Sequence, residues 1–376
     1  MITDNGSNQN NVDVEQESTD LAMKCLVGVF LTLIIFFSIT GNILVCLAIY
    51  SDRHLRKIGN IFLASLAVAD LFVASLVMTF AVANDLMGYW VFGSQFCDTW
   101  VAFDVMCCTA SILNLCAISL DRFIHIKDPL RYGRWLTKRV VLVSICAIWL
   151  LSGLVSFLPI SLGWHRPKKA EITQEERERP MCAMELTPVY AVVSSAISFY
   201  VPCVVMVALY TRLYLYAKKH VRSIRAITKP SQNSSGSRPH KNVRSVSQGS
   251  HHMMDHKAAI TLGIIMGVFL VCWVPFFCVN IIAAFCKTCI SDQVWKCLTW
   301  LGYFNSTMNP VIYSIFNTEF REAFRKILFS HIKGECCGAS DTAIQIIQFD
   351  RKTVSLQPVT SRIEIKCEDT GKVSEI

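Results

Sequence analysis

The feature that most constrains this chain is a series of seven long stretches that carry almost no charge. They run between ionisable residues over 24–52, 57–85, 98–121, 139–165, 185–212, 257–287 and 296–319. The only charged residues inside them are Asp70 and Asp104. A helix that crosses a bilayer needs about 20 mostly apolar residues, and within lipid each segment must satisfy its own backbone hydrogen bonds. The sequence therefore predicts an all-α membrane protein built as a bundle of seven transmembrane helices.

Composition supports this class and excludes several others. The chain is 53% hydrophobic and 17% charged, whereas soluble domains carry about 25% charged residues. So apolar a composition excludes disordered, collagen-like and coiled-coil proteins. The 17 cysteines in 376 residues are too sparse for a small disulfide scaffold.

The distribution of basic residues predicts the orientation in the membrane. Lysine and arginine gather in the loops that follow the first, third and fifth spans, whereas the N-terminal segment is acidic. Basic loops stay in the cytoplasm, so we expect a plasma-membrane protein with its N-terminus outside. The net charge of +8 then reflects this bias and not nucleic-acid binding. The expected parts are an extracellular tail over 1–24, a seven-helix domain over 25–329 with a flexible third cytoplasmic loop over 217–256, and a cytoplasmic tail over 330–376.

Asp104 is the first candidate binding residue, because a carboxylate inside a membrane span is costly and usually functional. It lies 17 residues before Asp121, which opens a basic cytoplasmic loop, so a helix places it about 25 Å away, toward the outer side. A lone anion in an outward-facing cavity suits a small organic cation, and we predict an ammonium site. The structural alternative is a carboxylate that only joins helices.

Neighbouring spans offer hydroxyl and aromatic groups for the other walls of such a cavity. Ser194, Ser195 and Ser198 are spaced so that they share one helix face and can hydrogen-bond polar ring substituents. Serine in a membrane helix also commonly bonds to its own backbone. The sixth span supplies aromatic faces and an amide for a flat ring or a cation, namely Trp273, Phe276, Phe277 and Asn280.

Asp70 is the second buried carboxylate and lies near the middle of its span. Its expected neighbours carry oxygen atoms, which suits a small hard cation such as sodium; they are Ser111, Asn305, Ser306 and Asn309. A protonated carboxyl group in a polar network is the alternative. We expect no other cofactor.

Several sequence motifs outside the spans indicate covalent modification or the binding of a partner protein. Cys97 and Cys182 both fall on the oxidising outer side, where a bridge is expected, and the Cys286-Lys287-Thr288-Cys289 run can form a second one. Asn5 begins a glycosylation sequon. An amphipathic stretch after the seventh span leads to Cys336 and Cys337, which is typical of an interfacial helix with palmitoylation. The final Ser374-Glu375-Ile376 matches a ligand of PDZ proteins.

These residues include a set of motifs that resembles the rhodopsin-like G-protein-coupled receptors over almost all of residues 24–328. The motifs are Gly41-Asn42, the Leu-Ala-Val-Ala-Asp run ending at Asp70, Asp121-Arg122-Phe123, Trp149, Pro202, Cys272-Trp273-Val274-Pro275 and Asn309-Pro310-Val311-Ile312-Tyr313. Asp104 with the three serines resembles the biogenic-amine subfamily. The stretches Val101-Ala102-Phe103-Asp104, 126–135 and 284–289 are most similar to invertebrate dopamine receptors of the D-one-like class.

This resemblance implies a ligand amine on Asp104 and catechol hydroxyls near the serines and Asn280. It adds Val105, Cys108, Trp300 and Tyr303 to the ligand-binding set, with Tyr303 hydrogen-bonded to Asp104. It also implies activation of a Gs-type G protein, raised cyclic AMP, and regulation by arrestin and a receptor kinase. The residues for coupling and switching would be Asp121, Arg122, Leu130, Tyr210, Asp255, Asn309, Pro310 and Tyr313.

Two positions depart from the family pattern, and two other functions stay open. Phe123 replaces a tyrosine, which bears on basal activity and coupling, and Cys108 replaces a serine of the vertebrate members. An octopamine, tyramine or other amine receptor is the first alternative. A cation-coupled transporter that uses Asp70 and Asp104 is a distant one, since the chain shows no repeated halves. An enzyme is not expected, because no nucleophile–base pair or metal-ligand set appears.

Overall fold

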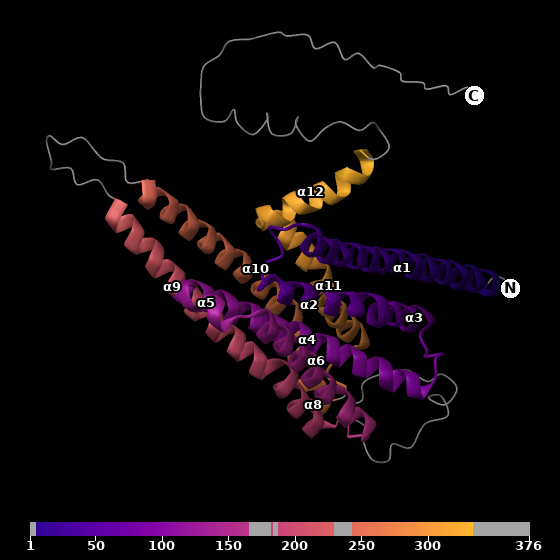
Figure 1. Cartoon of the computed structure of the whole chain (residues 1–376). Coiled ribbons are helices and arrows are strands. Elements are labelled where there is room, and N and C mark those ends of the chain that lie inside the picture. The colour runs from indigo at the N-terminus through magenta and orange to yellow at the C-terminus, as the bar shows by residue number, and fades with distance from the viewer. Residues whose placement is uncertain (1–4, 165–181, 183–186, 229–242, 287, 334–376) are drawn as a thin grey trace, which may run out of the picture. The chain divides into compact units, whose positions relative to one another are not determined.

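The computed structural model describes residues 5–164, 182, 187–228, 243–286 and 288–333. Long helices lie side by side over most of this part of the chain (Figure 1). They are α1 (Asn5–Ser51), α2 (Asn60–Phe72), η1 (Val73–Met78), α3 (Thr79–Met87), α4 (Ser94–Lys127), α5 (Pro129–Trp135), α6 (Lys138–Ser161), α8 (Pro188–Ser195), η2 (Ala196–Tyr200), α9 (Val201–Thr228), α10 (Val243–Phe285), α11 (Asp292–Phe316) and α12 (Thr318–Lys333). No strand occurs among the described residues, and the predicted all-α fold is confirmed.

Within the described residues, six helical segments are long and apolar enough to cross a membrane. They are Ser18–Ser51, Asn60–Met87, Ser94–Lys127, Lys138–Ser161, Pro188–Tyr216 and Ile260–Phe285. The seventh long helix, α11, has the required length at 25 residues. It is less apolar because it carries Asp292, Lys296, Asn305 and Asn309, and most of these polar groups serve the sites described below.

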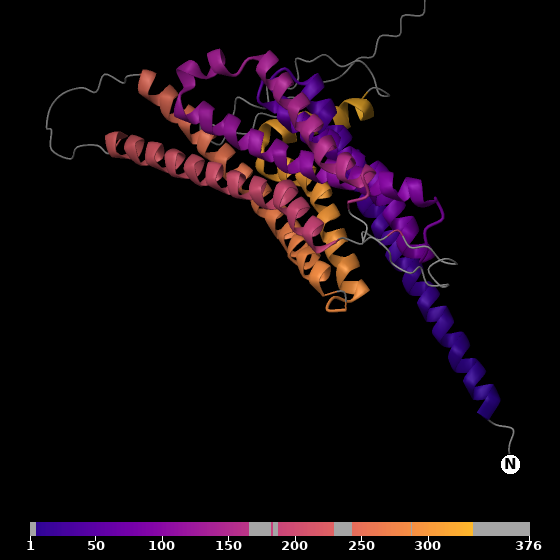
Figure 2. The same ribbon diagram turned by 90° about the horizontal axis from the view of Figure 1, so that it is seen from below.

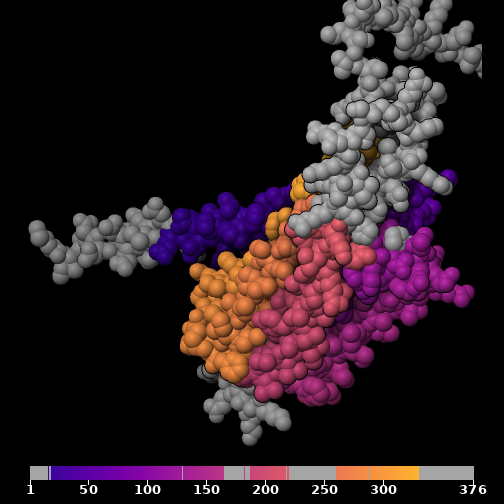
Figure 3. Space-filling model, turned by 90° about the vertical axis from the view of Figure 1, so that its left-hand side faces the viewer, coloured from indigo at the N-terminus to yellow at the C-terminus, as the bar shows by residue number. Residues whose placement is uncertain are grey.

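The central helix of the bundle is α4. It contacts α2, α6, α9 and α10 as well as both π-helical segments, η1 and η2. One face of the bundle shows α9 between α10 and α11 on one side and the α4–α6 region on the other (Figure 3). This placement lets α4 present residues to several neighbours at once.

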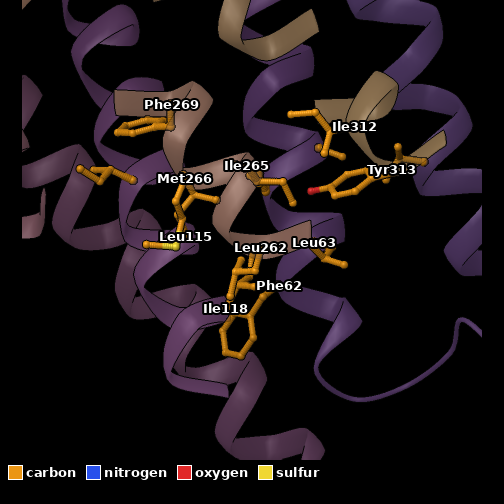
Figure 4. Close-up of a cluster of buried hydrophobic side chains, with 14 of the residues drawn as sticks. Phe62, Leu63, Leu115, Ile118, Leu262, Ile265, Met266, Phe269, Ile312 and Tyr313 are labelled. Carbon is orange, nitrogen blue, oxygen red and sulfur yellow. The ribbon is translucent and has the colours of Figure 1, made fainter. Parts of the chain in front are cut away.

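An apolar core packs between the helices, and Figure 4 shows the part of it that lies among α2, α4, α10 and α11. Each side chain labelled there is at most 7% exposed. Because lipid tails are as apolar as these side chains, close van der Waals packing between them favours the association of the helices. The residues come from α2 (Phe62, Leu63), α4 (Leu115, Ile118), α10 (Leu262, Ile265, Met266, Phe269) and α11 (Ile312, Tyr313).

Helices reach further than the sequence analysis expects at three ends. The first helix begins at Asn5, within the expected tail over 1–24, and its first turns extend beyond the neighbouring helices (Figure 2). In the segment expected to be a flexible loop, α9 continues to Thr228 and α10 begins at Val243. For α9 the reason lies in composition, because no proline or glycine interrupts residues 203–228.

Prolines and π-helical turns shape the helices that surround the centre of the bundle. Pro275 lies inside α10 and Pro310 inside α11, where each removes one backbone hydrogen bond. In the fifth span, η2 ends at Tyr200, two residues before Pro202. Such π-helical turns frequently occur at functional sites, and here η2 carries Ser198.

The described helices divide into two units, Met1–Ile327 and Leu328–Ile376. The first contains all seven long helices and every site discussed below. In the second, the structure describes only the end of α12.

Candidate functional site

A cavity opens among α4, the fifth-span helices and α10. Its empty volume is about 660 Å³, counting the part open to solvent. It is lined by Asp104, Val105, Cys108, Thr109, Tyr190, Ser194, Ser195, Ser198, Phe199, Phe269, Trp273, Phe276, Phe277 and Asn280. Three helical segments that lie far apart in sequence thus contribute to one site, and it contains ten of the twelve ligand-binding residues proposed from the sequence.

Asp104 is the only ionisable carboxylate in this lining. The Tyr303 hydroxyl donates a hydrogen bond of 2.9 Å to its Oδ2, and the Cys108 thiol donates one of 3.4 Å to its Oδ1. None of the ion pairs between described residues involves Asp104. The site therefore holds a carboxylate that has two neutral donors and no cationic partner from the described part of the protein, which is the arrangement that a cationic ligand completes.

The three serines have different environments. The Ser194 hydroxyl donates to the backbone oxygen of Ala191 at 3.3 Å, and the Ser195 Oγ accepts a hydrogen bond of 3.1 Å from the Asn280 side-chain amide. Ser198 is 7% exposed, and its hydroxyl has no hydrogen-bond partner among the described residues. A buried hydroxyl without a partner is costly, so Ser198 is the serine most in need of a partner from a ligand.

Aromatic rings from η2 and α10 also line the cavity. Phe199 and Phe277 stack with ring centroids 4.1 Å apart, and Trp273 meets Phe276 edge-to-face at 5.8 Å. The Trp273 ring is held closely from behind, since a Cβ atom on Gly302 would lie 2.8 Å from it. These contacts create a rigid apolar surface suited to a flat ring.

Four lining residues were missed in the sequence analysis. Each lies four residues from a predicted one on the same helix: Thr109 follows Val105, Tyr190 precedes Ser194, Phe199 follows Ser195, and Phe269 precedes Trp273. Extending each predicted face by one helical turn would have found all of them.

Two predicted ligand-binding residues, Trp300 and Tyr303, are not among the residues that line the cavity. Tyr303 is 1% exposed and reaches Asp104 from behind the lining. The Trp300 indole N–H donates instead to Asp85 Oδ2 at 2.8 Å. Disulfide bridges join Cys97 to Cys182 and Cys286 to Cys289. The first bridge ties the beginning of α4 to a residue between α6 and α8.

A second polar cluster surrounds Asp70, which is fully buried. The Asn309 side-chain amide donates a hydrogen bond of 2.7 Å to its Oδ2. The other carboxylate oxygen has no hydrogen-bond partner within the described ranges, and neither does Asn305 Oδ1. The predicted oxygen-bearing residues on α4 and α11 are also buried, at 3–4% exposure; they are Ser111, Asn305, Ser306 and Asn309. The cluster thus contains two buried oxygens without hydrogen-bond donors in the described part of the chain.

The predicted coupling residues gather at the other end of α4. Arg122 Nε lies 3.5 Å from Asp121 Oδ2, and its Nη2 donates to Asn60 Oδ1 at 2.9 Å. The Tyr132 hydroxyl donates to Asp121 Oδ1 at 2.7 Å. Burial and then this contact with Asp121 raise the pKa of Tyr132, so its hydroxyl remains a donor. The contact of Arg122 with Asn60 on α2 was not expected from the sequence.

Three further predicted switch residues have distinct surroundings. Leu130 is 97% exposed. The Tyr210 hydroxyl lies against Gly263 of α10, where a Cβ atom has no room. Tyr313 is buried and stacks on Phe320 at 5.1 Å. The side chains of Asn5 and Asp255, and residues Cys336, Cys337 and 374–376, lie outside the part of the chain that the structure describes in detail.

The sequence is similar to those of known proteins over most of its length. Residues 41–313 match the family described as "7 transmembrane receptor (rhodopsin family)". The chain is 62% identical to dopamine receptor 1 of Drosophila melanogaster over 344 residues, which cover 88% of the chain and 67% of the relative. It is 42% identical to the D(1) dopamine receptor of Carassius auratus over 334 residues (82% and 90%). It is 41% identical to the D(1C) dopamine receptor of Xenopus laevis over 361 residues (92% and 75%).

Proposed function

Because the chain belongs to the rhodopsin family of seven-transmembrane receptors, we propose that it is a cell-surface receptor for dopamine that activates a Gs-type G protein. The family resemblance inferred from the motifs is confirmed, and membership makes the chain a multi-pass membrane receptor and not an enzyme. The observation that carries the ligand proposal is Asp104, a carboxylate facing an aromatic cavity without a cationic partner in the described structure. The names of the relatives support dopamine as the amine.

Ligand recognition follows from the three walls of the cavity. The protonated amine of dopamine would pair with Asp104, where attraction in a partly dry site is much stronger than in water. The catechol hydroxyls would reach the fifth-span serines, and Ser198, which has no partner among the described residues, would gain one. The catechol ring would lie against the surface formed by Trp273, Phe276 and Phe277.

Signal transfer would use the proline-containing helices. The agonist favours the state that it binds better, which we propose is one where α10 swings outward at Pro275. This motion would separate Tyr210 from Gly263 and open the cytoplasmic end. Arg122 would leave Asp121 and Asn60 to engage the G protein, and the exposed Leu130 would insert into the G-protein surface. The N-terminus would be extracellular and the C-terminus cytoplasmic, as the basic loops indicate.

A sodium ion would bind at Asp70 as an allosteric ligand. The oxygens of Asp70 and Asn305 that lack partners among the described residues would hold it, together with Ser111, Ser306 and Asn309. The ion would supply a positive charge to a buried carboxylate. If sodium prefers the resting state, linkage requires that it weaken agonist binding.

The decisive experiment compares amines side by side. Cells that express the receptor, and mock-transfected cells, are treated with dopamine, octopamine and tyramine while cyclic AMP is measured. We expect dopamine to raise cyclic AMP at the lowest concentration, and only in the receptor-expressing cells. If octopamine or tyramine raises cyclic AMP at a lower concentration than dopamine does, the protein is a receptor for that amine instead. Dopamine binding without any rise in cyclic AMP would contradict Gs coupling.

A further inference from the structure

A chain of contacts connects Asp104 to the outer ends of α3 and α11. Asp85 lies near the end of α3, where Lys296 Nζ approaches its Oδ1 at 3.4 Å and the Trp300 indole N–H donates to its Oδ2 at 2.8 Å. Both donors come from α11. Asp85, Lys296 and Trp300 are not among the cavity-lining residues, so the proposed recognition of dopamine does not account for these contacts.

Trp300 links this outer carboxylate to the inner one. Trp300 and Tyr303 are three residues apart on α11 and so share a helix face, and their rings meet edge-to-face with centroids 5.5 Å apart. Tyr303 is 1% exposed and donates its hydrogen bond to Asp104. Asp85, Trp300, Tyr303 and Asp104 thus form one continuous series of contacts from α3 through α11 to α4.

The two contacts of Asp85, its ion pair with Lys296 and its hydrogen bond from Trp300, differ in strength. The Asp85 and Lys296 side chains are 20% and 40% exposed, and an ion pair this exposed adds little to the free energy of unfolding. The indole hydrogen bond is stronger, because its acceptor is charged. It also fixes the orientation of a ring that would otherwise rotate about two side-chain torsions. The contact with Asp85 therefore orients Trp300 more than it stabilises the fold.

We propose that Asp85 is a positioning residue for the amine anchor: it holds Trp300, which in turn keeps the Tyr303 hydroxyl directed at Asp104. Asp85 acts on the ligand through these residues without touching it. This inference rests on the proposed function, since it concerns the affinity of Asp104 for an amine.

A double-mutant cycle tests the proposal through the binding of tritiated dopamine to the full-length receptor in membranes. Asp85→Ala removes the acceptor, and Trp300→Phe removes the donor but keeps a ring. We expect each to weaken dopamine about fivefold, a typical coupling between sites. In a Tyr303→Phe background, where the series is already broken, Asp85→Ala should cause no further loss. Independent losses that multiply in the double variant would overturn the proposal, because Asp85 would then act on the ligand without Tyr303.

A conservative variant separates positioning from a general structural role. In Asp85→Asn the amide oxygen still accepts the indole hydrogen bond, so most of the affinity lost in Asp85→Ala should return. An asparagine variant as weak as the alanine variant would contradict the role of this hydrogen bond. We expect the Asp85 variants and the unmodified receptor to have equal numbers of binding sites and, without ligand, equal heat stability. If both quantities fall in parallel with dopamine affinity, the positioning proposal is overturned.

Matched controls keep this test separate from the proposed function. Glu319→Gln breaks another partly exposed ion pair, that with Lys57, and should leave dopamine affinity unchanged. If Asp104→Ala abolishes binding while Asp85→Ala and Trp300→Phe bind normally, the positioning role fails and the proposed function stands. If Asp104→Ala itself binds normally, the proposed function fails first.

Discussion

The surroundings of Asp104 and Asp70 differ although both are carboxylates inside membrane spans. Asp104 lines a cavity of about 660 Å³ with aromatic walls, and neutral donors reach both of its oxygens. Asp70 is fully buried, accepts from Asn309 at one oxygen, and has no partner in the described structure at the other. Asp104 faces a cavity with room for an organic guest, whereas Asp70 is enclosed by the protein.

This difference shows that the space around a buried charge decides its role more than the charge itself. Removing a carboxylate from water is costly wherever it occurs. At Asp104 the cost is offset when an organic cation enters, so the residue suits ligand recognition. At Asp70, which is fully buried, we propose that a small cation plays this part and that the residue modulates the balance between states. Four predictions test this contrast.

The largest effect is expected for Asp104. Asp104→Ala should weaken dopamine binding by at least about 100-fold, since truncating one partner of a buried charge pair costs several kcal/mol. Asp104→Asn keeps the volume of the side chain and should lose nearly as much, which would assign the loss to charge and not to cavity shape. Saturation binding with dopamine measures both variants, and surface labelling confirms that they reach the membrane. Normal affinity in either variant would refute the ammonium pairing.

Ser198→Ala should have the next largest effect. Its hydroxyl lacks a partner among the described residues, so a ligand hydrogen bond there would contribute about 1 kcal/mol and its loss about a fivefold to tenfold drop in dopamine affinity. An amine without ring hydroxyls should be unaffected. Ser194→Ala is the matched control, because Ser194 already bonds to its own helix backbone. Competition binding with both amines checks this, and equal losses for the two serine variants would contradict it.

Asp70→Asn should leave dopamine recognition nearly intact but remove its dependence on sodium. In the unmodified receptor, replacing potassium by sodium at constant ionic strength should weaken dopamine about fivefold through linkage. The variant lacks the charge that holds the ion, so its affinity should be the same in both salts. A sodium effect that persists in Asp70→Asn would place the ion elsewhere, and no sodium effect in the unmodified receptor would remove the claim.

The smallest effect is expected for Asn280→Ala. Asn280 donates to Ser195 across the fifth and sixth spans, and a neutral hydrogen bond contributes about 0.5–1.5 kcal/mol. Because Ser195 can still bond to the ligand, we expect only about a twofold change in dopamine affinity at the low end of that range. Measured beside Ser198→Ala in the same assay, a larger loss for Asn280→Ala would show that this amide contacts the ligand directly.

Much of the site could be predicted from the sequence, because helical periodicity places residues on a common face. Ser194, Ser195 and Ser198 do line one cavity with Asp104 and Trp273. The same periodicity could not show that the three hydroxyls differ, since their partners come from other helices or from their own backbone. It also could not show that the Trp300 indole donates to Asp85, because the rotation of α11 depends on close contacts such as Gly302 against Trp273.

The amino-acid sequence by itself determined the number and position of the spans, since the transfer of a segment into lipid depends mainly on the side chains that it carries. It also identified Asp104 and Asp70 as the two costly charges. Only the tertiary structure decided which side chains close the cavity around Asp104 and which polar atoms of the described residues are left without partners. Those properties depend on how helices from distant parts of the chain pack together, and that packing is set jointly by all of them.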